Sequence, residues 1–344
     1  MASVCHPPCF TLAGATDDSP APIRAIRHAP RASSRKLVLS GPMPENNARF
    51  STVIAGKLLL VALAVALFAC NPDAKILRLS CEDGNLAVCN ELGQRLVTGD
   101  HVLRDYVWAA SLFQQVCDGG VAQGCYRLGR MHESGRGIVE DKGLMLTMFR
   151  RACDGGESAG CNRLGTMYRD SVGIVADLNL ALGLFQQACD GGSMLGCTNL
   201  GLAYRAGMRV PQDHARAAEL FTQACDTDEM SGCYRLGQSY ADGAGVAQND
   251  ERAVELFEQA CDGEAWAGCL ELGALFADGR SVEQDFERAA ELYRRACNRR
   301  LGEACYRLGR LYQSGNGVNR SPGTGGFYIG RACDYGYQVA CGGS

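Results

Sequence analysis

Residues 213–246, DHARAAELFTQACDTDEMSGCYRLGQSYADGAGV, contain the features that decide the fold. Their first apolar side chains follow one another at spacings of three and four residues: Ala217, Leu220, Phe221 and Ala224. This spacing places them on one face of an amphipathic helix. A cysteine comes next, and a second cysteine lies eight residues later in another apolar segment that ends at a glycine. The stretch therefore predicts two short helices joined by a tight turn.

The same unit recurs every 36 residues without an insertion. A strict period of this size is typical of a solenoid, in which each unit packs only on its neighbours. The units are marked by cysteine pairs: Cys81 and Cys89, Cys117 and Cys125, Cys153 and Cys161, Cys189 and Cys197, Cys225 and Cys233, Cys261 and Cys269, Cys297 and Cys305, and Cys333 and Cys341. We therefore predict an all-α solenoid of stacked helix hairpins over residues 81–344. Its repeats start at residues 81, 117, 153, 189, 225, 261, 297 and 333.

Capping residues with the same period predict the helix boundaries. One column holds good N-cap residues: Asp105, Asp141, Asp177, Asp213, Asn249, Asp285 and Ser321. The helix that begins there is expected to stop at Cys-Asp-Gly-Gly, as at residues 117–120, because glycine readily adopts the left-handed cap. The next helix is expected to end at a glycine column that includes Gly135 and is broken only by Ser171. Small residues such as Gly124 should let the two helices approach closely.

The sequence of the N-terminal region predicts a signal peptide for secretion. Residues 53–69 form an apolar run interrupted only by Lys57, and Arg49 supplies a positive flank. The ending Leu-Phe-Ala-Cys70 resembles a bacterial lipobox, which implies cleavage before Cys70 and its diacylation. We expect residues 1–42 to be an over-extended start or disordered, 43–69 to be the signal peptide, and 70–80 to be the lipidated N-terminus and linker. The alternative is an uncleaved membrane anchor, although the run is short for a span of about 20 residues.

Composition narrows the class of function. Of the 344 residues, 47% are hydrophobic and 21% are charged, and the formal net charge is -4. This balance argues against intrinsic disorder. It also argues against nucleic-acid binding, which requires a basic surface. Residues 70–344 contain 27 basic and 35 acidic side chains, so the expected mature chain has a net charge of -8.

The repeat cysteines are expected to form structural disulfides, because a secreted chain meets an oxidising compartment. Pairing within each hairpin uses all sixteen repeat cysteines and leaves Cys70 for lipid. Pairing between successive repeats would leave Cys81 and Cys341 without a partner, although sequence alone does not dictate the connectivity.

The alternatives to structural disulfides are a zinc cluster and a redox dithiol. Zinc requires four ligands in compact spacing, whereas the histidines after Cys70 fall in unrelated columns: His101, His132 and His214. A redox dithiol requires Cys-x-x-Cys, which is missing from the sequence. We expect no metal and no cofactor.

The combined pattern resembles the Sel-1-like repeat family. The resemblance is carried over about residues 73–341 by Leu-Gly-x-x-Tyr, Gly-x-Gly-Val, Asp, and Ala-x-x-Leu-Phe-x-x-Ala-Cys-Asp-Gly-Gly. The added cysteine pairs make the chain similar to the cysteine-rich Hcp type, which implies disulfides within each hairpin. The chain departs from the family at residues 321–326, SPGTGG, which are poor helix formers. The last unit, residues 321–344, is therefore expected to be less regular.

The Hcp-type resemblance also implies slow hydrolysis of bound penicillins, but the sequence contains no motif for it. Serine β-lactamases use Ser-x-x-Lys. The one match, Ser33 to Lys36, precedes the expected signal peptide, and the lysines after Cys70 are Lys75 and Lys142, neither in such a motif. We predict no catalytic residue. A binding scaffold is the preferred interpretation, and a β-lactamase-like hydrolase is the alternative.

Polar side chains in fixed columns are the candidate binding residues, because repeat proteins bind along an extended face. On the first helix of the hairpins these are Trp108, Gln115, Arg151, Gln187, Arg216, Gln223, Arg252, Gln259, Arg288 and Arg295. The resemblance implies that this helix lines a concave groove for a protein, a peptide or a peptidoglycan fragment. The alternative is a solvated face with ordinary i,i+3 ion pairs: Arg216 with Glu219, Arg252 with Glu255, and Arg288 with Glu291.

The second helix repeats Tyr-Arg at residues 126–127, 234–235 and 306–307. Tyrosine and arginine are favoured at interfaces, whereas in a stacked repeat they commonly cover the seam between neighbours. Taken together, these features predict a secreted or envelope-anchored repeat scaffold. We expect a lipid on Cys70 to hold it at the bacterial outer membrane or facing the periplasm.

Overall fold

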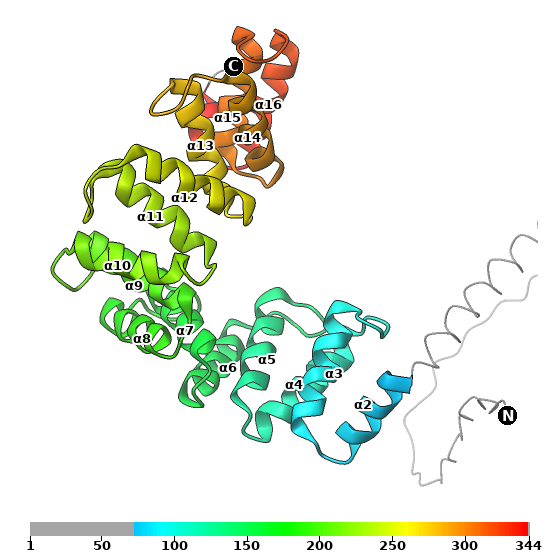
Figure 1. Ribbon diagram of the computed structural model, residues 1–344. Coiled ribbons are helices and arrows are strands. Elements are labelled where there is room, and N and C mark those ends of the chain that lie inside the picture. The colour runs from blue at the N-terminus through cyan, green and yellow to red at the C-terminus, as the bar shows by residue number, and fades with distance from the viewer. Residues whose placement is uncertain (1–71, 343–344) are drawn as a thin grey trace, which may run out of the picture. The chain divides into compact units, whose positions relative to one another are not determined.

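The computed structural model describes residues 72–342, and within them it contains sixteen helices and no strand (Figure 1). The helices are α2 (Pro72–Glu82), α3 (Leu86–Thr98), α4 (Tyr106–Asp118), α5 (Ala122–Ser134), α6 (Lys142–Asp154), α7 (Ser158–Asp170), α8 (Leu178–Asp190), α9 (Met194–Ala206), α10 (His214–Cys225), α11 (Met230–Asp242), α12 (Asp250–Asp262), α13 (Trp266–Asp278), α14 (Phe286–Asn298), α15 (Gly302–Ser314), α16 (Pro322–Asp334) and α17 (Gln338–Cys341). The expected signal peptide and Cys70 lie outside the described residues.

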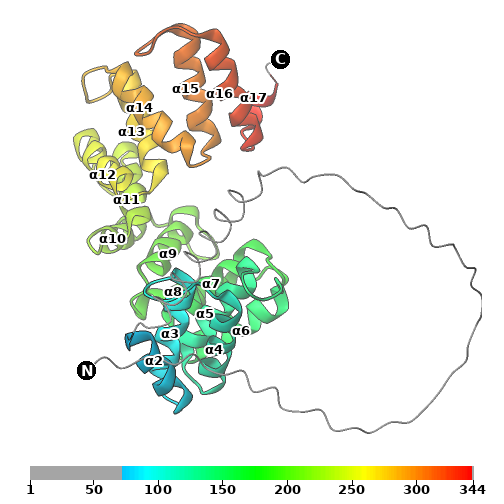
Figure 2. The same ribbon diagram turned by 90° about the vertical axis from the view of Figure 1, so that its right-hand side faces the viewer.

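The helices stack in chain order. From α3 to α16, each helix packs on the next helix along the chain (Figure 1, Figure 2). The solenoid unit comprises residues 77–99 and 104–342. Contacts between α7 and α9, and between α9 and α11, also join equivalent helices of adjacent repeats. The predicted all-α repeat solenoid is confirmed.

The capping columns position every hairpin. All seven predicted N-cap side chains accept a hydrogen bond from a backbone N–H in the first turn of their helix. At the end of α7, Ser171 takes the left-handed conformation with φ of 57°, as the glycines do in the other repeats. The structure therefore keeps the same chain reversal even where the sequence lacks glycine.

The glycine after each leucine makes room for an aromatic ring of the next hairpin. At Gly201 a Cβ atom would lie 2.6 Å from Cε1 of Phe221, which is closer than any real Cβ contact. The same contact recurs between Gly93 and Phe113, Gly129 and Phe149, Gly165 and Phe185, Gly237 and Phe257, and Gly273 and Tyr293. These rings are buried. Each ring therefore locks one hairpin onto the next.

The small residues inside each hairpin have the predicted role. A Cβ at Gly124 would overlap the side chain of Val116, and one at Gly160 would lie 2.7 Å from Cβ of Ala152. The two helices of a hairpin therefore approach too closely for a larger side chain, and the core is filled instead by the aromatic and leucine columns.

Both ends of the described chain are more helical than the sequence suggested. Residues 72–80, expected to belong to a linker, lie in α2. Residues 322–334 form α16 despite their glycines, because Ser321 caps the helix, Pro322 occupies its first turn, and Tyr328 stacks on Tyr312 at 5.6 Å between ring centroids. The last unit is still incomplete, since α17 has only four residues.

A second left-handed column offers a stabilising substitution. It follows the first helix of each hairpin and holds glycine at Gly84, Gly120, Gly156, Gly192 and Gly336. Asp228, Glu264 and Arg300 occupy it with φ of 61°, 69° and 67°. A Cβ atom meets nothing within 4 Å at the glycine positions, so the cost at the other three is conformational.

Glu264→Gly is expected to raise the free energy of unfolding by about 1 kcal/mol, because the left-handed conformation costs a non-glycine residue about 1–2 kcal/mol, partly offset by the greater freedom of glycine in the unfolded chain. The exposed Arg299–Glu264 ion pair that is lost contributes little. Thermal unfolding followed by circular dichroism measures the change. Glu258→Gly, inside α12, is the matched control and should lower stability by about 1 kcal/mol. A loss of stability in Glu264→Gly would contradict the prediction.

Candidate functional site

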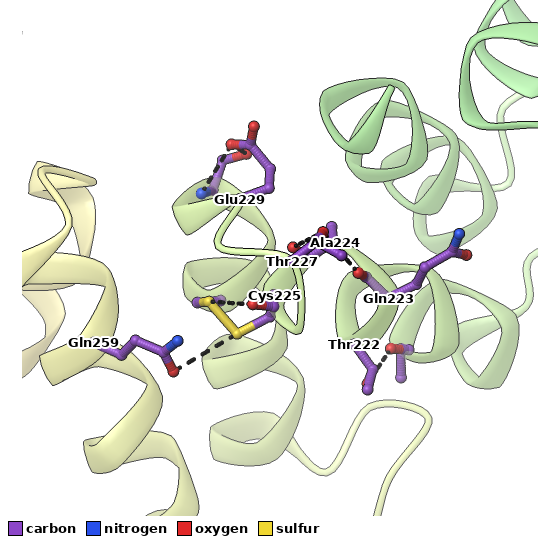
Figure 3. Close-up of a disulfide and its surroundings, with 10 residues drawn as sticks. Thr222, Gln223, Ala224, Cys225, Thr227, Glu229 and Gln259 are labelled. Carbon is purple, nitrogen blue, oxygen red and sulfur yellow. Dashed lines mark hydrogen bonds between the residues drawn. A yellow bond between two sulfur atoms is a disulfide. The ribbon is translucent and has the colours of Figure 1, made fainter. Parts of the chain in front are cut away.

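Eight disulfides connect the two helices of the hairpins, and each joins the cysteines predicted as a pair. They join Cys81 with Cys89, Cys117 with Cys125, Cys153 with Cys161, Cys189 with Cys197, Cys225 with Cys233, Cys261 with Cys269, Cys297 with Cys305, and Cys333 with Cys341. The Cα atoms of the paired cysteines lie 4.5 to 4.9 Å apart. Figure 3 shows the Cys225 bridge between the end of α10 and the start of α11.

The bridges bury their sulfur atoms in the hairpins. The second cysteines, on the odd-numbered helices, are almost fully buried as far as the seventh hairpin: Cys89, Cys125, Cys161, Cys197, Cys233, Cys269 and Cys305. Cys341 in the last, incomplete unit is exposed. No group of three or more histidine, cysteine, aspartate or glutamate side chains in the described chain is arranged to hold a metal ion. The cysteines of the described chain therefore have a structural role.

Several side chains of the predicted binding column contact the preceding hairpin. Arg151 donates a hydrogen bond from Nη2 to the carbonyl oxygen of Cys117 at 2.8 Å, and Arg295 donates one to Cys261 at 3.2 Å. The Gln259 side-chain oxygen lies 3.8 Å from Sγ of Cys225 and points at the bridge (Figure 3). Cationic side chains at these carbonyls complement the negative end of a helix dipole. These contacts join repeats, which leaves the side chains less free for a ligand.

The arginines of the second predicted column also have partners. Arg216 pairs with Glu219 at 2.7 Å and Arg252 with Glu255 at 2.5 Å, as the sequence predicts. Arg288 instead pairs with Glu258 of the preceding hairpin at 2.9 Å, so the predicted pair of Arg288 with Glu291 is wrong. The Arg288 guanidinium also lies 4.4 Å from the centroid of the Phe276 ring. This cation–π contact favours the orientation of the side chain toward the neighbouring repeat.

Trp108 is half-buried, and the Arg78 guanidinium lies 5.4 Å from its ring. Trp108 and Gln115 line one shallow hollow with Arg78. Gln187 and Gln223 lie on α8 and α10. The predicted column thus spans the first helices of successive hairpins, and its binding role stays a prediction.

Three hollows lie on the other side of the hairpins, along the odd-numbered helices. Their volumes are about 480 Å³ at α3 and α5, about 280 Å³ at α7 and α9, and about 290 Å³ at α11 and α13. We call this surface the odd-helix face; the residues that define it are Gln94, Val97, Arg127, Arg130, Arg169, Asn199, Leu202, Arg205, Gln238, Asp242, Glu271 and Arg307.

A ladder of polar contacts connects the odd helices at positions about one repeat apart. Asn199 on α9 donates to the side-chain oxygen of the buried Asn162 on α7 at 2.7 Å, and Arg169 donates to Asn199 at 3.1 Å. Arg205 donates to Gln238 on α11 at 3.2 Å. Buried polar groups bonded in this way fix the register of neighbouring repeats and the spacing of the hollows.

The Tyr-Arg pairs divide between the seam and this face. The rings of Tyr126 and Tyr234 pack on Phe149 and Phe257 of the next hairpin, with centroids 5.9 and 6.1 Å apart. The adjacent arginines Arg127 and Arg307 line hollows, and Tyr126 also lines the hollow of Arg127. The tyrosines therefore cover the seam as the sequence suggested, whereas the position of the arginines was missed. The sequence signal that could have shown their position was the spacing of apolar and polar residues along the second helix.

Charge is unevenly distributed over the odd-helix face. At α13, burial raises the pKa of Glu271 above its ordinary value of 4.5, and the neighbouring carboxylates of Glu303 and Asp242 raise it further. At α5, burial lowers the pKa of Arg127. The α11–α13 hollow is lined by Asp242, Glu271 and Asp278 together with Arg280 and Arg307, whereas the α3–α5 hollow is lined by three arginines and Glu157.

Glu271→Gln is expected to raise the melting temperature at neutral pH. Because the pKa of Glu271 is higher in the folded protein than in the unfolded chain, ionising this side chain costs folding free energy. The cost is complete above the folded pKa and disappears as the pH falls through the unfolded value of 4.5. Melting curves should therefore show a gain at pH 7 that vanishes near about pH 4. A gain of equal size at both pH values would contradict this assignment.

A family model described as Sel1 repeat matches seven segments of the chain: residues 86–121, 122–157, 158–193, 195–226, 231–264, 266–300 and 302–337. No curated protein sequence matches the chain. Within residues 72–342, no helix is both long and apolar enough to cross a membrane.

Two solved structures, one from Oxalobacter formigenes and one from uropathogenic Escherichia coli, show the same fold. A Sel1 repeat protein from Oxalobacter formigenes is 23% identical, with a TM-score of 0.59 over 78% of each chain. A protective antigen present in uropathogenic Escherichia coli strains, described as displaying an SLR fold, is 25% identical with a TM-score of 0.57 over 77% of this chain. The chain spans 57% of the length of that antigen. Helicobacter pylori cysteine rich protein B is 27% identical over 38% of this chain and 94% of its own, with a TM-score of 0.32.

Proposed function

The chain belongs to the Sel1 repeat family, and from this premise we propose that it is a protein-binding scaffold whose odd-helix face holds an extended segment of a partner polypeptide. The observation that carries the proposal is the recurrence of hollows between equivalent helices of successive repeats. Stacked repeats create extended binding surfaces of this kind. An extended chain laid across successive odd helices would meet mainly guanidinium groups at α3–α5 and carboxyl groups mixed with guanidinium groups at α11–α13.

The contacts of the two candidate faces favour the odd-helix face over the predicted column. Arg151, Arg295 and Arg288 already bond the preceding hairpin. On the odd-helix face, Leu202 lines a mainly apolar hollow beside Arg205 and Asn199, whose polar contacts leave the hollow open. Leu202 makes none of these polar contacts, so its side chain can contact a ligand without breaking a hydrogen bond between repeats.

Site-specific photocrosslinking in the producing cells tests this proposal. A benzophenone amino acid at Leu202 should join the protein to one partner polypeptide. The same probe at Leu180, which is 42% exposed on the predicted column, and at Val139, which is 84% exposed in a loop, should not. A partner captured at Leu180 but not at Leu202 would return the site to the predicted column. Absence of any adduct at Leu202 and Leu180 would count against a protein-binding scaffold.

We further propose that the scaffold is held at the bacterial cell envelope by a lipid on Cys70. The eight disulfides support an oxidising compartment, and the lipobox-like ending at Cys70 supports the anchor. Cys70→Ala should move the protein from the membrane pellet to the soluble fraction. Retention of the variant in the pellet would argue against lipidation.

Two alternatives from the sequence stay predictions: binding of a peptidoglycan fragment, and slow hydrolysis of β-lactams. No contact of the described residues bears on either activity. Turnover of a chromogenic β-lactam by the oxidised protein, followed through size-exclusion fractions, would establish the hydrolase alternative.

A further inference from the structure

The hollow at α3 and α5 combines three arginines with an apolar wall, whereas the two arginines of the α7–α9 hollow already donate hydrogen bonds to Asn199 and Gln238. The guanidinium groups of Arg127, Arg130 and Arg136 line it together with the apolar side chains of Val97 and Met131. The phenyl ring of Phe113 from α4 also contributes to the wall. A planar guanidinium fork matches the geometry of a carboxylate. The lining therefore suits a ligand that carries a carboxylate and an apolar group close together.

Arg127 has an unused hydrogen-bonding capacity. Its Nε is buried, and no described residue accepts a hydrogen bond from it or forms an ion pair with this guanidinium. The side chain lies 5.7 Å from the centroid of the Phe113 ring, and burial lowers its pKa. A buried donor without an acceptor costs free energy. The Nη groups of the same guanidinium have no acceptor either and, unlike Nε, are not buried, so an anionic ligand in the hollow can accept hydrogen bonds from them.

The remaining charges of the hollow leave it net positive. Arg130 is already paired with Glu133 at 2.8 Å. Arg136 lies 5.8 Å from the centroid of the Tyr106 ring and forms no ion pair within the described chain. The one acidic side chain in the lining is Glu157, which attracts Arg127 without reaching ion-pair distance. The lining thus contains two guanidinium groups without an ion-pair partner, those of Arg127 and Arg136, and one carboxylate, that of Glu157.

We propose that this hollow binds the C-terminal carboxylate of a partner polypeptide whose last residue is apolar. The carboxylate accepts hydrogen bonds from Arg127 and Arg136, and the last side chain packs against Val97, Met131 and Phe113. A C-terminal residue carries both groups on one residue, whereas an internal aspartate or glutamate carries a carboxylate without an adjacent apolar group of its own. Binding of the C-terminal carboxylate of a peptide is a recurrent mode of peptide recognition. The inference rests on the proposed scaffold function and adds the chemistry of the bound segment.

The test is a selection from a random hexapeptide pool with free C-termini on the full-length, oxidised protein. The selected pool should be enriched in peptides that end in leucine, isoleucine, valine or phenylalanine. Fluorescence anisotropy then compares one enriched peptide with its C-terminally amidated form, and amidation should weaken binding at least tenfold. Arg127→Gln should weaken binding of the free peptide by at least tenfold. Arg299→Gln is the matched control, because Arg299 also lies over an aromatic ring, that of Trp266, but lines none of the three hollows of the odd-helix face.

The outcomes separate this inference from the proposed function. Arg299→Gln should change affinity by less than twofold, and unchanged melting temperatures in both variants would exclude unfolding as the cause. Equal binding of free and amidated peptides would overturn the C-terminal assignment and favour recognition of an internal segment. A pool without enrichment for an apolar last residue would also overturn it. If Leu202 still crosslinks to a partner in that case, the scaffold function stands and only this site is lost.

Discussion

Reduction of all eight disulfides is expected to unfold the solenoid. Each bridge joins cysteines that are eight residues apart, for which the chain-entropy relation gives about 2.5 kcal/mol. Eight such loops sum to about 20 kcal/mol, which exceeds the usual stability of about 5–15 kcal/mol for a folded domain. The entropy estimate is an upper figure, because bridges often contribute less than the relation gives. Even half of it would remove most of the stability of the fold.

Circular dichroism at 222 nm, before and after reduction and alkylation, measures this loss. The helical signal should fall to that of a largely unfolded chain. Because stability in a repeat array is a sum of local and nearest-neighbour terms, removing one bridge should matter most in the middle. Replacing Cys189 and Cys197 together by alanine should lower the melting temperature more than replacing Cys333 and Cys341, since Cys341 is exposed at the end of the described chain. A reduced protein that still melts cooperatively from a helical state would refute the prediction.

The repeat period made the architecture predictable from sequence. Each capping residue and cysteine sits at a fixed offset, so the boundaries found at Asp213 and Gly243 follow from local chemistry. The ends were harder, because their structure depends on tertiary contacts. Residues 322–334 have low helix propensity, and packing such as the Tyr328–Tyr312 stack overrides it.

The candidate site was less predictable than the fold. Residues in one column share a position in the repeat, but the sequence does not show which neighbouring residue each of them contacts. Arg151 and Gln187 are equivalent in sequence, yet Arg151 is long and cationic enough to reach the carbonyl oxygen of Cys117. The sequence suggested a seam position for Arg127 because it adjoins Tyr126, which does lie at the seam. Only the packed structure shows that Tyr126 contacts Phe149 and that both Tyr126 and Arg127 line the α3–α5 hollow.

Phe221→Ala is expected to lower the free energy of unfolding by about 3–5 kcal/mol, the cost of truncating a buried phenylalanine. The side chain is 0% exposed, and its ring fills the space over Gly201 of the preceding hairpin. Its loss leaves a cavity at the junction of α9 and α10, in the middle of the array. Chemical unfolding should show the shift, whereas Phe327→Ala, which truncates a ring that is 61% exposed, should change stability by less than about 0.5 kcal/mol.

A double-mutant cycle tests whether the ring and the glycine act as one unit. Gly201→Ala alone places a methyl group against the ring, and overpacking of this kind costs about 1–3 kcal/mol. It also gains about 1 kcal/mol of helix propensity. In the Phe221→Ala background the ring contact is gone and the Ala217 carbonyl oxygen, at 3.2 Å, is the remaining close neighbour, so the same methyl group should cost much less. The two changes should therefore couple by about 0.5–3 kcal/mol. Additive effects would mean that Gly201 is retained for a reason other than the ring of Phe221.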